Sequence, residues 1–260
     1  ETTNVDFYAY QYKPVLSFLE SPSNGLLIAD EVGLGKTIEA GLIWTELRAR
    51  YDARRLVVFC PAMLREKWRD ELRERFGVDA VIIGAKDLLE ELKNEKHLLP
   101  AGKGFVCSIQ GSRPPSGWQP GVNTSQSAAA ELASFLQESA DREPIIDLVV
   151  IDEAHYLRNP QTQTARLGRL LRDVTENLIL LSATPINLGE SDLFHLLKLV
   201  DPDSFYDVRV FPEILAANEP LVRAARLIRD KTVSAETINS TLHEALDHRL
   251  LSGSRQLHDI

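Results

Sequence analysis

A glycine-rich stretch in the first part of the chain has the composition of a phosphate-binding loop. It reads ADEVGLGKT over residues 29–37 and lies between a short apolar run and a helical pattern. A turn of this kind directs several backbone N–H groups toward one point, beside the positive end of the helix dipole. Gly33 and Gly35 permit backbone conformations that larger residues obstruct. Lys36 can reach the β- and γ-phosphates and the Thr37 hydroxyl can ligate Mg²⁺, so the stretch predicts a nucleotide site.

The same stretch departs from the strict phosphate-loop pattern at one position. The pattern G-x-x-x-x-G-K-[ST] requires glycine where this sequence has Asp30. A chance glycine-rich turn with an exposed lysine is therefore the alternative interpretation. The strand–loop–helix context favours the phosphate loop, because that is the setting in which such loops bind phosphates.

A pair of carboxylates follows the strongest predicted strand of the chain, in the sequence LVVIDEAH. Asp152 and Glu153 come where that predicted strand meets solvent, and open α/β sheets bind ligands at the carboxyl ends of their strands. Asp152 is predicted to hold Mg²⁺ through water, and Glu153 to orient and deprotonate the attacking water. His155 can couple this site to a neighbouring motif. Taken alone, the sequence DEAH is a surface acidic cluster as often as a catalytic one. Together with the phosphate loop, it predicts a catalytic site.

The elements that must position these residues alternate between strand and helix patterns. This alternation predicts an α/β fold, a mostly parallel sheet with helices on both faces. Continuous Val, Ile and Leu runs are typical of strands covered on both faces. The predicted strands are 25–29, 55–60, 79–83, 104–109, 145–152 and 177–185. The predicted helices between them are 37–51, 62–76, 86–97 and 127–139.

Beyond about residue 201 the pattern changes. No strand-like run remains, and helical segments such as EPLVRAARLIRD and SAETINSTLHEALDH follow. We therefore expect two domains: residues 1–200 as the nucleotide-binding lobe and residues 201–260 as a helical extension. Residues 110–124, rich in Pro, Gly and Ser, are predicted to form an irregular surface loop.

Composition adds few constraints. The chain of 260 residues is 44% hydrophobic and 26% charged, as in ordinary globular proteins. No stretch approaches the roughly 18 apolar residues of a membrane helix, and the acidic start ETTNVD does not resemble a signal peptide. Cys60 and Cys107 each end a strand-like run without a metal-ligand neighbour, so buried reduced thiols are expected. The net charge of −9 neither indicates nor excludes nucleic-acid binding. We expect a cytoplasmic protein.

These motifs resemble those of one family. The chain resembles the first RecA-like lobe of a superfamily-two helicase-like ATPase of the Swi/Snf type, nearest to its bacterial RapA-like branch. DEVGLGKT corresponds to motif I, in which Asp30 is normal, and residues 152–155 correspond to motif II. Ser182-Ala183-Thr184-Pro185 corresponds to motif III. The three motifs stand in the family's order, and the resemblance covers roughly residues 8–205.

The resemblance implies roles for individual residues. Gln11, in YQYKPVLSFL, corresponds to the glutamine that reads adenine, with a polar helix residue as the alternative. Residues His155, Ser182 and Thr184 are implied to couple hydrolysis to nucleic-acid contact. Phe7 and Tyr8 either flank the adenine or have a plain packing role. The resemblance gives Mg²⁺ and ATP as cofactors and implies nucleotide contacts from Glu31, Gly33, Leu34, Gly35, Lys36, Thr37 and Ile38.

Nucleic-acid contacts are also implied. VFCPAMLREKW resembles motif Ia, which places Pro61, Arg65 and Lys67 on the phosphodiester backbone, with Arg69 nearby. A solvated amphipathic helix face with Trp68 packed inward explains these residues almost as well. Ser108 and Gln110 lie where the family has motif Ib, and residues 113–118 form a candidate nucleic-acid or partner contact.

The resemblance also implies what this chain lacks. Motors of this family bind ATP between two RecA-like lobes, and the second lobe supplies arginine fingers worth about 10³–10⁵ in rate. No second lobe follows Pro185, and Arg249 and Arg255 are finger candidates only by elimination. We therefore expect a fragment of a longer bacterial, nucleoid-associated protein that translocates on double-stranded DNA. The fragment alone is expected to bind ATP with little turnover.

Three alternatives stay open. One is a strand-separating DEAH-type helicase, and another is a non-catalytic ATPase-like scaffold, against which the intact Lys36, Thr37, Asp152 and Glu153 argue. The third is a GTPase-like switch, which the absence of an Asn-Lys-x-Asp motif disfavours.

Overall fold

The computed structural model describes residues 9–29, 35–96, 102–121, 127–183, 189–229, 234–246, 248–249 and 251. The chain divides into two compact units, Glu1–Ser204 and Phe205–Ile260. The described part contains no helix that is both long and apolar enough to span a membrane.

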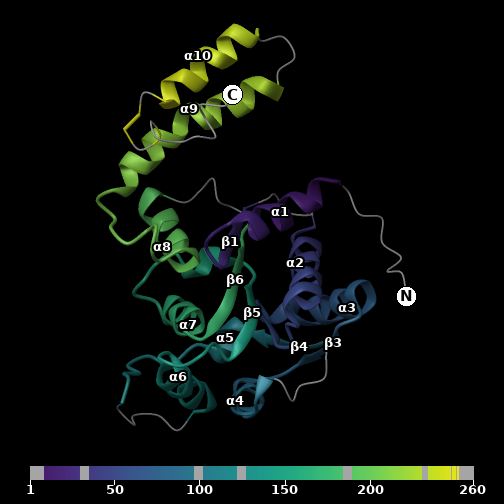
Figure 1. The fold of residues 1–260 in the computed structure, drawn as a ribbon. Helices are drawn as coiled ribbons and strands as arrows, with labels where there is room; N and C mark the ends of the chain where they lie inside the picture. Colours follow the sequence, from purple (N-terminus) through teal and green to yellow (C-terminus); the bar gives the residue numbers. More distant parts are fainter. Residues whose placement is uncertain are drawn as a thin grey trace. The chain divides into compact units, whose positions relative to one another are not determined.

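A six-stranded sheet forms the centre of the first unit (Figure 1). The order of its strands is β1-β6-β5-β2-β4-β3, and every pairing among the described residues is parallel. All five residues of β2 are buried, because helices cover both faces of the sheet. The strands are β1 (Gly25–Ile28), β2 (Leu56–Cys60), β3 (Asp79–Ile82), β4 (Lys103–Ser108), β5 (Ile146–Ile151) and β6 (Thr175–Leu181).

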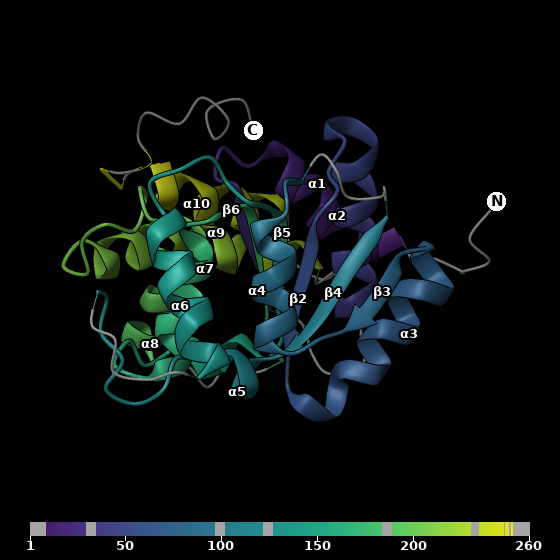
Figure 2. The same ribbon diagram turned by 90° about the horizontal axis from the view of Figure 1, so that it is seen from below.

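Helices divide between the two faces, as the alternation in the sequence predicted (Figure 2). One apolar core holds Val58 of β2 together with side chains of α1 (Lys13–Glu20), α2 (Lys36–Tyr51) and α3 (Arg65–Phe76). The other core holds Phe59, whose side chain points to the opposite face, with side chains of four further helices. These are α4 (Ala85–Lys93), α6 (Ala128–Ser139), α7 (Gln163–Arg172) and α8 (Glu190–Val200). The predicted α/β fold is confirmed.

Short helical turns complete the first unit. One precedes α1, and the other three follow β2, β4 and β5 at the carboxyl edge of the sheet. They are η1 (Ala9–Tyr12), η2 (Ala62–Leu64), α5 (Ile109–Ser112) and η4 (Ala154–Leu157). Helices α2 and α3 approach closely at Gly41. The ring of Phe76 occupies the space that a Cβ at this position would need, so the approach depends on glycine. This contact fixes α3 against the helix that follows the phosphate loop.

The second unit contains two described helices, α9 (Phe211–Arg229) and α10 (Ala235–Leu246). Arg223 pairs with Glu244 at 2.9 Å, and Arg249 pairs with Glu213 at 2.8 Å. Pro220 lies inside α9. The unit is helical, as the pattern of its sequence predicted.

Candidate nucleotide-binding site

The predicted motifs follow strands that are neighbours in the sheet. Ile28 pairs with Leu181, and Ile151 pairs with both Leu180 and Phe59. Parallel strands bring their carboxyl ends to one edge, and neighbouring strands lie about 4.8 Å apart. The segments after β1, β6, β5 and β2 therefore start side by side, although they are far apart in sequence.

Gly35 caps the helix that begins with the predicted phosphate-binding lysine. Its φ of 93° lies in the left-handed region, where glycine is favoured. Its carbonyl accepts hydrogen bonds from the backbone N–H of Ile38 and of Glu39, at 2.7 and 3.1 Å. Lys36 and Thr37 lie half-buried in the first turn of α2. Glu31, Gly33 and Leu34 lie outside the described residues.

Gln11 lies directly beside this glycine. Its side chain is only 3% exposed, and a Cβ at residue 35 would come within 2.5 Å of its Nε2 atom. The structure thus brings η1 to the start of α2, across more than twenty residues of sequence, and a side chain at residue 35 would displace the end of the Gln11 side chain. Tyr10 and Tyr12, on either side of Gln11, are exposed. Phe7 and Tyr8 lie outside the described residues.

The Asp152 carboxylate is held by two N–H groups. The backbone N–H of Glu153 donates to Oδ1 at 2.8 Å, and the indole N–H of Trp68 donates to Oδ2 at 2.9 Å. The backbone of Asp152 is fixed as well, since its N–H donates to the Phe59 carbonyl at 2.8 Å. Trp68 packs inward, as in the alternative interpretation of this helix as a solvated amphipathic one, but no pattern in the sequence indicated its bond to a residue 84 positions away.

Glu153 has a backbone conformation that is unusual for its residue type. Its φ of 53° and ψ of 47° are left-handed, which costs a non-glycine residue about 1–2 kcal/mol. Its Oε2 atom lies 3.0 Å from Nδ1 of His155, and both side chains are partly exposed. The structure therefore brings together the predicted general base and the predicted coupling residue. Strain of this kind persists where the surrounding structure fixes the residue.

Ser182 follows β6 and is buried, at 1% exposure. Its backbone N–H donates to the Ile28 carbonyl at 2.9 Å, which joins the start of motif III to the end of β1. Thr184 lies outside the described residues.

The donors present fit a magnesium ion that binds together with a nucleotide. Each oxygen of Asp152 accepts one hydrogen bond and keeps a further acceptor direction. Across the described ranges, no group of three or more His, Cys, Asp or Glu side chains gathers as a metal site. Mg²⁺ is usually held by one or two carboxylates plus substrate phosphates and water. Asp152 and the Thr37 hydroxyl suit that arrangement.

Comparison with known proteins decides the family. A family model described as the SNF2-related domain matches residues 10–256. The chain belongs to the SNF2-related family.

Curated relatives include RNA polymerase-associated protein RapA from two bacteria. The SNF2-related chain is 29% identical over 225 residues to that of Pseudomonas syringae pv. tomato, covering 84% of this chain and 21% of the relative. It is 32% identical over 196 residues to that of Vibrio atlanticus, covering 72% and 18%. The chain thus spans about a fifth of the length of these relatives.

A solved structure has a similar fold. It is the Sulfolobus solfataricus SWI2/SNF2 ATPase core in complex with dsDNA, with a TM-score of 0.52 and 17% sequence identity. The match covers 80% of this chain and 38% of that chain. It supports a RecA-like fold for the SNF2-related chain, as the motif order implied.

The residues predicted for nucleic-acid contact lie at the carboxyl ends of β2 and β4. Pro61 caps η2, and Arg65 begins α3 with its Nε bonded to the Ala62 carbonyl at 3.1 Å. Lys67 is exposed, 3.9 Å from Glu71. Arg69 is paired with Asp70 at 2.8 Å, and this hydrogen bond lowers the pKa of Asp70.

Ser108 has a structural role that the sequence analysis missed. Its Oγ accepts a hydrogen bond from the Gly111 backbone N–H at 3.2 Å and so caps α5. The same hydroxyl donates to Oε1 of Gln110 at 3.2 Å. A serine three residues before the N–H it caps is a recognisable signal, which the Pro, Gly and Ser-rich composition of residues 110–124 obscured.

Trp118 is an exception in a segment that is otherwise largely exposed. Residues 110–124 were predicted to form a surface loop, and residues 113–118 a contact for nucleic acid or a partner. Trp118 is only 3% exposed and donates its indole N–H to Ser134 at 3.3 Å. The guanidinium of Arg166 lies 5.6 Å from its ring centre. Trp118 thus anchors the segment to the core, because this large aromatic side chain is more stable buried than in water, while residues such as Arg113 and Gln119 stay exposed.

The two cysteines are buried and free, as predicted. Burial raises the pKa of the Cys60 thiol to about 12; the negative charge of Asp152 adds to this rise and Arg65 opposes it. Burial raises the pKa of Cys107 as well.

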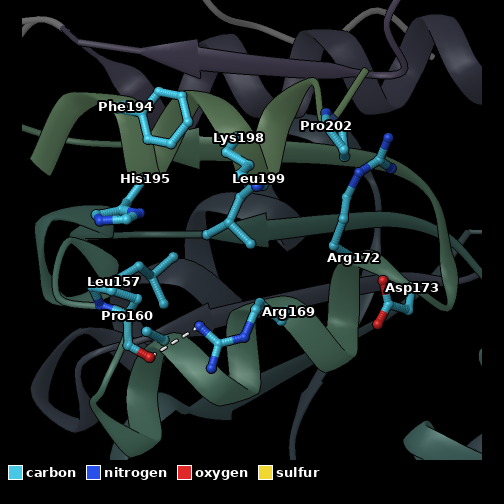
Figure 3. A pocket seen from close by; sticks show the side chains of 11 residues that line it. Leu157, Pro160, Arg169, Arg172, Asp173, Phe194, His195, Lys198, Leu199 and Pro202 are labelled. Carbon is cyan, nitrogen blue, oxygen red and sulfur yellow. Dashed lines mark hydrogen bonds between the residues drawn. The ribbon is translucent and has the colours of Figure 1, made fainter. Parts of the chain in front are cut away.

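A groove of about 410 Å³ lies between α7 and α8 (Figure 3). Its walls combine apolar side chains with basic ones, and Nη1 of Arg169 donates to the Pro160 carbonyl at 3.1 Å. None of the predicted site residues lines it. The lining residues are Leu157, Pro160, Ala165, Arg169, Arg172, Asp173, Phe194, His195, Lys198, Leu199 and Pro202.

Proposed function

We propose that this chain is the ATP-binding lobe of a DNA-dependent ATPase of the Swi/Snf type. The observation that carries the proposal is the meeting of three segments at one edge of the sheet. Gln11 lies against Gly35, the first turn of α2 follows, and the fixed carboxylate of Asp152 follows β5, which is separated from β1 by β6 in the sheet. A chain of the SNF2-related family that keeps all three has the parts needed to bind Mg-ATP.

The proposed roles follow from chemistry and position. Lys36 binds the β- and γ-phosphates, and Thr37 and Asp152 hold Mg²⁺, which neutralises the charge of the phosphates when bound. Glu153 orients the attacking water and accepts its proton. Nδ1 of His155 lies 3.0 Å from Oε2 of Glu153 and so contacts the carboxylate directly. We propose that Gln11 reads adenine and that His155, Ser182 and Thr184 couple hydrolysis to nucleic-acid contact. Glu31, Gly33, Leu34, Gly35 and Ile38 complete the nucleotide site.

DNA is the proposed partner of the whole protein. The similar solved core is in complex with dsDNA, and the relatives are RNA polymerase-associated. We propose that Pro61, Arg65, Lys67 and Ser108 contact the phosphate backbone. These residues share one edge of the sheet, so a local basic path is compatible with the net charge of −9. The protein then acts in the bacterial cytoplasm, at the nucleoid.

Turnover is proposed to need a second RecA-like lobe, which supplies the arginine fingers. Residues 1–200 are the proposed first lobe and residues 201–260 a helical protrusion. In the described part of the second unit, Arg249 is paired with Glu213, which does not favour it as a finger. Arg255 lies outside the described residues.

Nucleotide binding by the purified chain tests the proposal. With a fluorescent ATP analogue and excess Mg²⁺, we expect Lys36→Ala to weaken binding at least about tenfold, since it removes the charge that meets the phosphates. Lys86→Ala is the matched control, because Lys86 is an exposed lysine of α4 on the other face of the sheet. Equal affinity of wild type and Lys36→Ala contradicts the proposal and favours the non-catalytic scaffold.

Two further measurements separate the alternatives. Fast, DNA-stimulated hydrolysis by this chain alone contradicts the requirement for a second lobe. With the full-length protein, displacement of a triplex strand without duplex unwinding supports translocation. Efficient duplex unwinding instead identifies a strand-separating helicase.

A further inference from the structure

We infer that Trp68 is a positioning residue that holds the Asp152 carboxylate in register for Mg²⁺ and connects the metal site to helix α3. The inference rests on the proposed function and extends it to a residue outside the three motifs. It assigns the indole N–H of Trp68, and not its bulk, the decisive role.

The geometry fixes both carboxylate oxygens from different directions. Trp68 Nε1 donates to Oδ2 at 2.9 Å from α3, and the Glu153 backbone donates to Oδ1 at 2.8 Å from the strand end. Hydrogen bonds to an ionised acceptor are about twice as strong as neutral ones. With one acceptor direction of each oxygen occupied, rotation of the carboxylate is restricted and its remaining directions are set. Groups that orient a metal ligand in this way typically change metal affinity about 10–100-fold when removed.

Trp44 shows that packing alone does not require this bond. Trp44 and Trp68 are 0% and 2% exposed and belong to the same apolar core. The Nε1 of Trp44 makes no hydrogen bond to any described residue. A buried indole N–H is therefore tolerated in this core without a partner, so the pairing of Trp68 with Asp152 calls for a separate explanation.

The position of Trp68 on α3 places the hydrogen bond to Asp152 close to a proposed nucleic-acid contact. Arg65, a proposed phosphate contact, begins the same helix one turn earlier. Both Arg65 and Asp152 influence the pKa of Cys60, so all three lie in one electrostatic neighbourhood. A displacement of α3 by nucleic acid moves the indole N–H and, through it, the carboxylate. Trp68 thus gives the proposed DNA contact a direct connection to the metal-binding residue.

Metal-dependent nucleotide binding by the full chain tests the inference. A fluorescent ATP analogue is titrated with Mg²⁺ and with EDTA, so the readout does not depend on tryptophan emission. We expect Trp68→Phe to lose about tenfold in affinity with Mg²⁺ and to match wild type in EDTA. Trp44→Phe, which removes an equally buried but unpaired N–H, is expected to match wild type in both. Equal Mg²⁺ dependence of Trp68→Phe and Trp44→Phe overturns the inference.

A double-mutant cycle with Asp152→Asn sharpens the test. If Trp68 acts through Asp152, the two substitutions are not additive, and Trp68→Phe changes the Mg²⁺ dependence little in the Asp152→Asn background. Additive losses overturn the inference. Absence of Mg²⁺-dependent binding in the wild-type chain rejects the proposed function itself, which separates the two failures.

A second measurement does not depend on the folding of a Trp68 variant. Indole ¹⁵N–¹H signals of the three tryptophans are assigned by substituting Trp44 and Trp118. We expect the Trp68 signal to shift in Asp152→Asn and on addition of nucleotide with Mg²⁺, and the Trp44 signal to stay in place. A Trp68 signal that is insensitive to both overturns the inference.

Discussion

At the scale of single residues, Glu153 combines a left-handed backbone with a position next to His155. Glu153→Gln keeps the size of the side chain but removes its ability to accept a proton. We expect the variant of the full-length protein to hydrolyse ATP about 10²–10⁴-fold more slowly, since that is the usual contribution of a general base. Nucleotide affinity of the chain is expected to stay within about twofold, because the phosphates are bound by other groups.

Glu190→Gln is the control for this substitution, because Glu190 is an exposed glutamate that begins α8. A Glu153→Gln protein with near wild-type turnover contradicts the assigned role. Loss of both turnover and affinity indicates instead that Glu153 supports the structure of the site.

The Cys60 thiol predicts a pH dependence of stability. Burial raises its pKa from 9.0 to about 12 in the folded protein. The folded state thus holds this proton more tightly than the unfolded state. The resulting stabilisation is complete below about pH 9 and is lost as pH rises toward the folded-state pKa, with a slope of up to about 1.4 kcal/mol per pH unit.

Urea unfolding at pH 8 and pH 10 measures this effect. We expect wild type to lose more stability between the two pH values than Cys60→Ala does, because alanine has no thiol to ionise. The slope from lysines and tyrosines is common to both proteins and cancels. An identical pH dependence of the two proteins contradicts the prediction.

At the scale of elements, Arg55 joins three of them at the amino-terminal edge of the sheet. It is fully buried immediately before β2, and it donates to the carbonyls of Ile145, Glu91 and Asn94 at 2.8–2.9 Å. Two of these carbonyls belong to the carboxyl end of α4 and the residue after it, where carbonyls lack the donor they have in a helix interior; the Glu91 carbonyl also accepts from the Asn94 N–H at 3.3 Å. Burial lowers the pKa of Arg55, and nearby Asp147 and Glu91 oppose that shift.

We expect Arg55→Leu to lower the free energy of unfolding by about 3 kcal/mol or more. Each buried carbonyl that loses its donor costs about 1–3 kcal/mol. Arg54→Leu is the matched control, because Arg54 pairs with the exposed Asp52, and such surface pairs contribute about 0–1 kcal/mol. Chemical denaturation of both variants measures the difference; a loss for Arg55→Leu no larger than for Arg54→Leu contradicts the assigned role.

At the scale of the whole molecule, the chain separates into two compact units at Ser204 and Phe205. The described residues of the nucleotide site, from Gln11 to Ser182, all belong to the first unit. We expect residues 1–204 to fold cooperatively and to bind the ATP analogue with an affinity within about threefold of the full chain, since domains hold their own cores. Thermal unfolding and titration of the shortened chain check this. A loss of affinity well beyond that range shows that the second unit supports the site.

The sequence by itself determined the local features of this protein. Each of the six strands was predicted, because buried parallel strands need apolar runs: β2 is apolar throughout, and β5 is apolar except for Asp147. Motifs I and II were predicted at the ends of such runs, because ligands bind at the carboxyl edge of a parallel sheet. Membership of the SNF2-related family, implied by motif order, is confirmed.

Only the tertiary structure decided which of these segments meet. Strand order is not sequence order, since β1 pairs with β6 and β2 lies between β5 and β4. Side-chain contacts such as that of Trp68 with Asp152 and that of Gln11 with Gly35 depend on this order. Trp118 is buried and lies near the guanidinium of Arg166, which is distant in sequence. Composition carries no information on such a contact, and for that reason it assigned Trp118 to a surface loop. Periodicity specifies which face of an element is buried, whereas the partner on that face is set by the packing of the whole lobe.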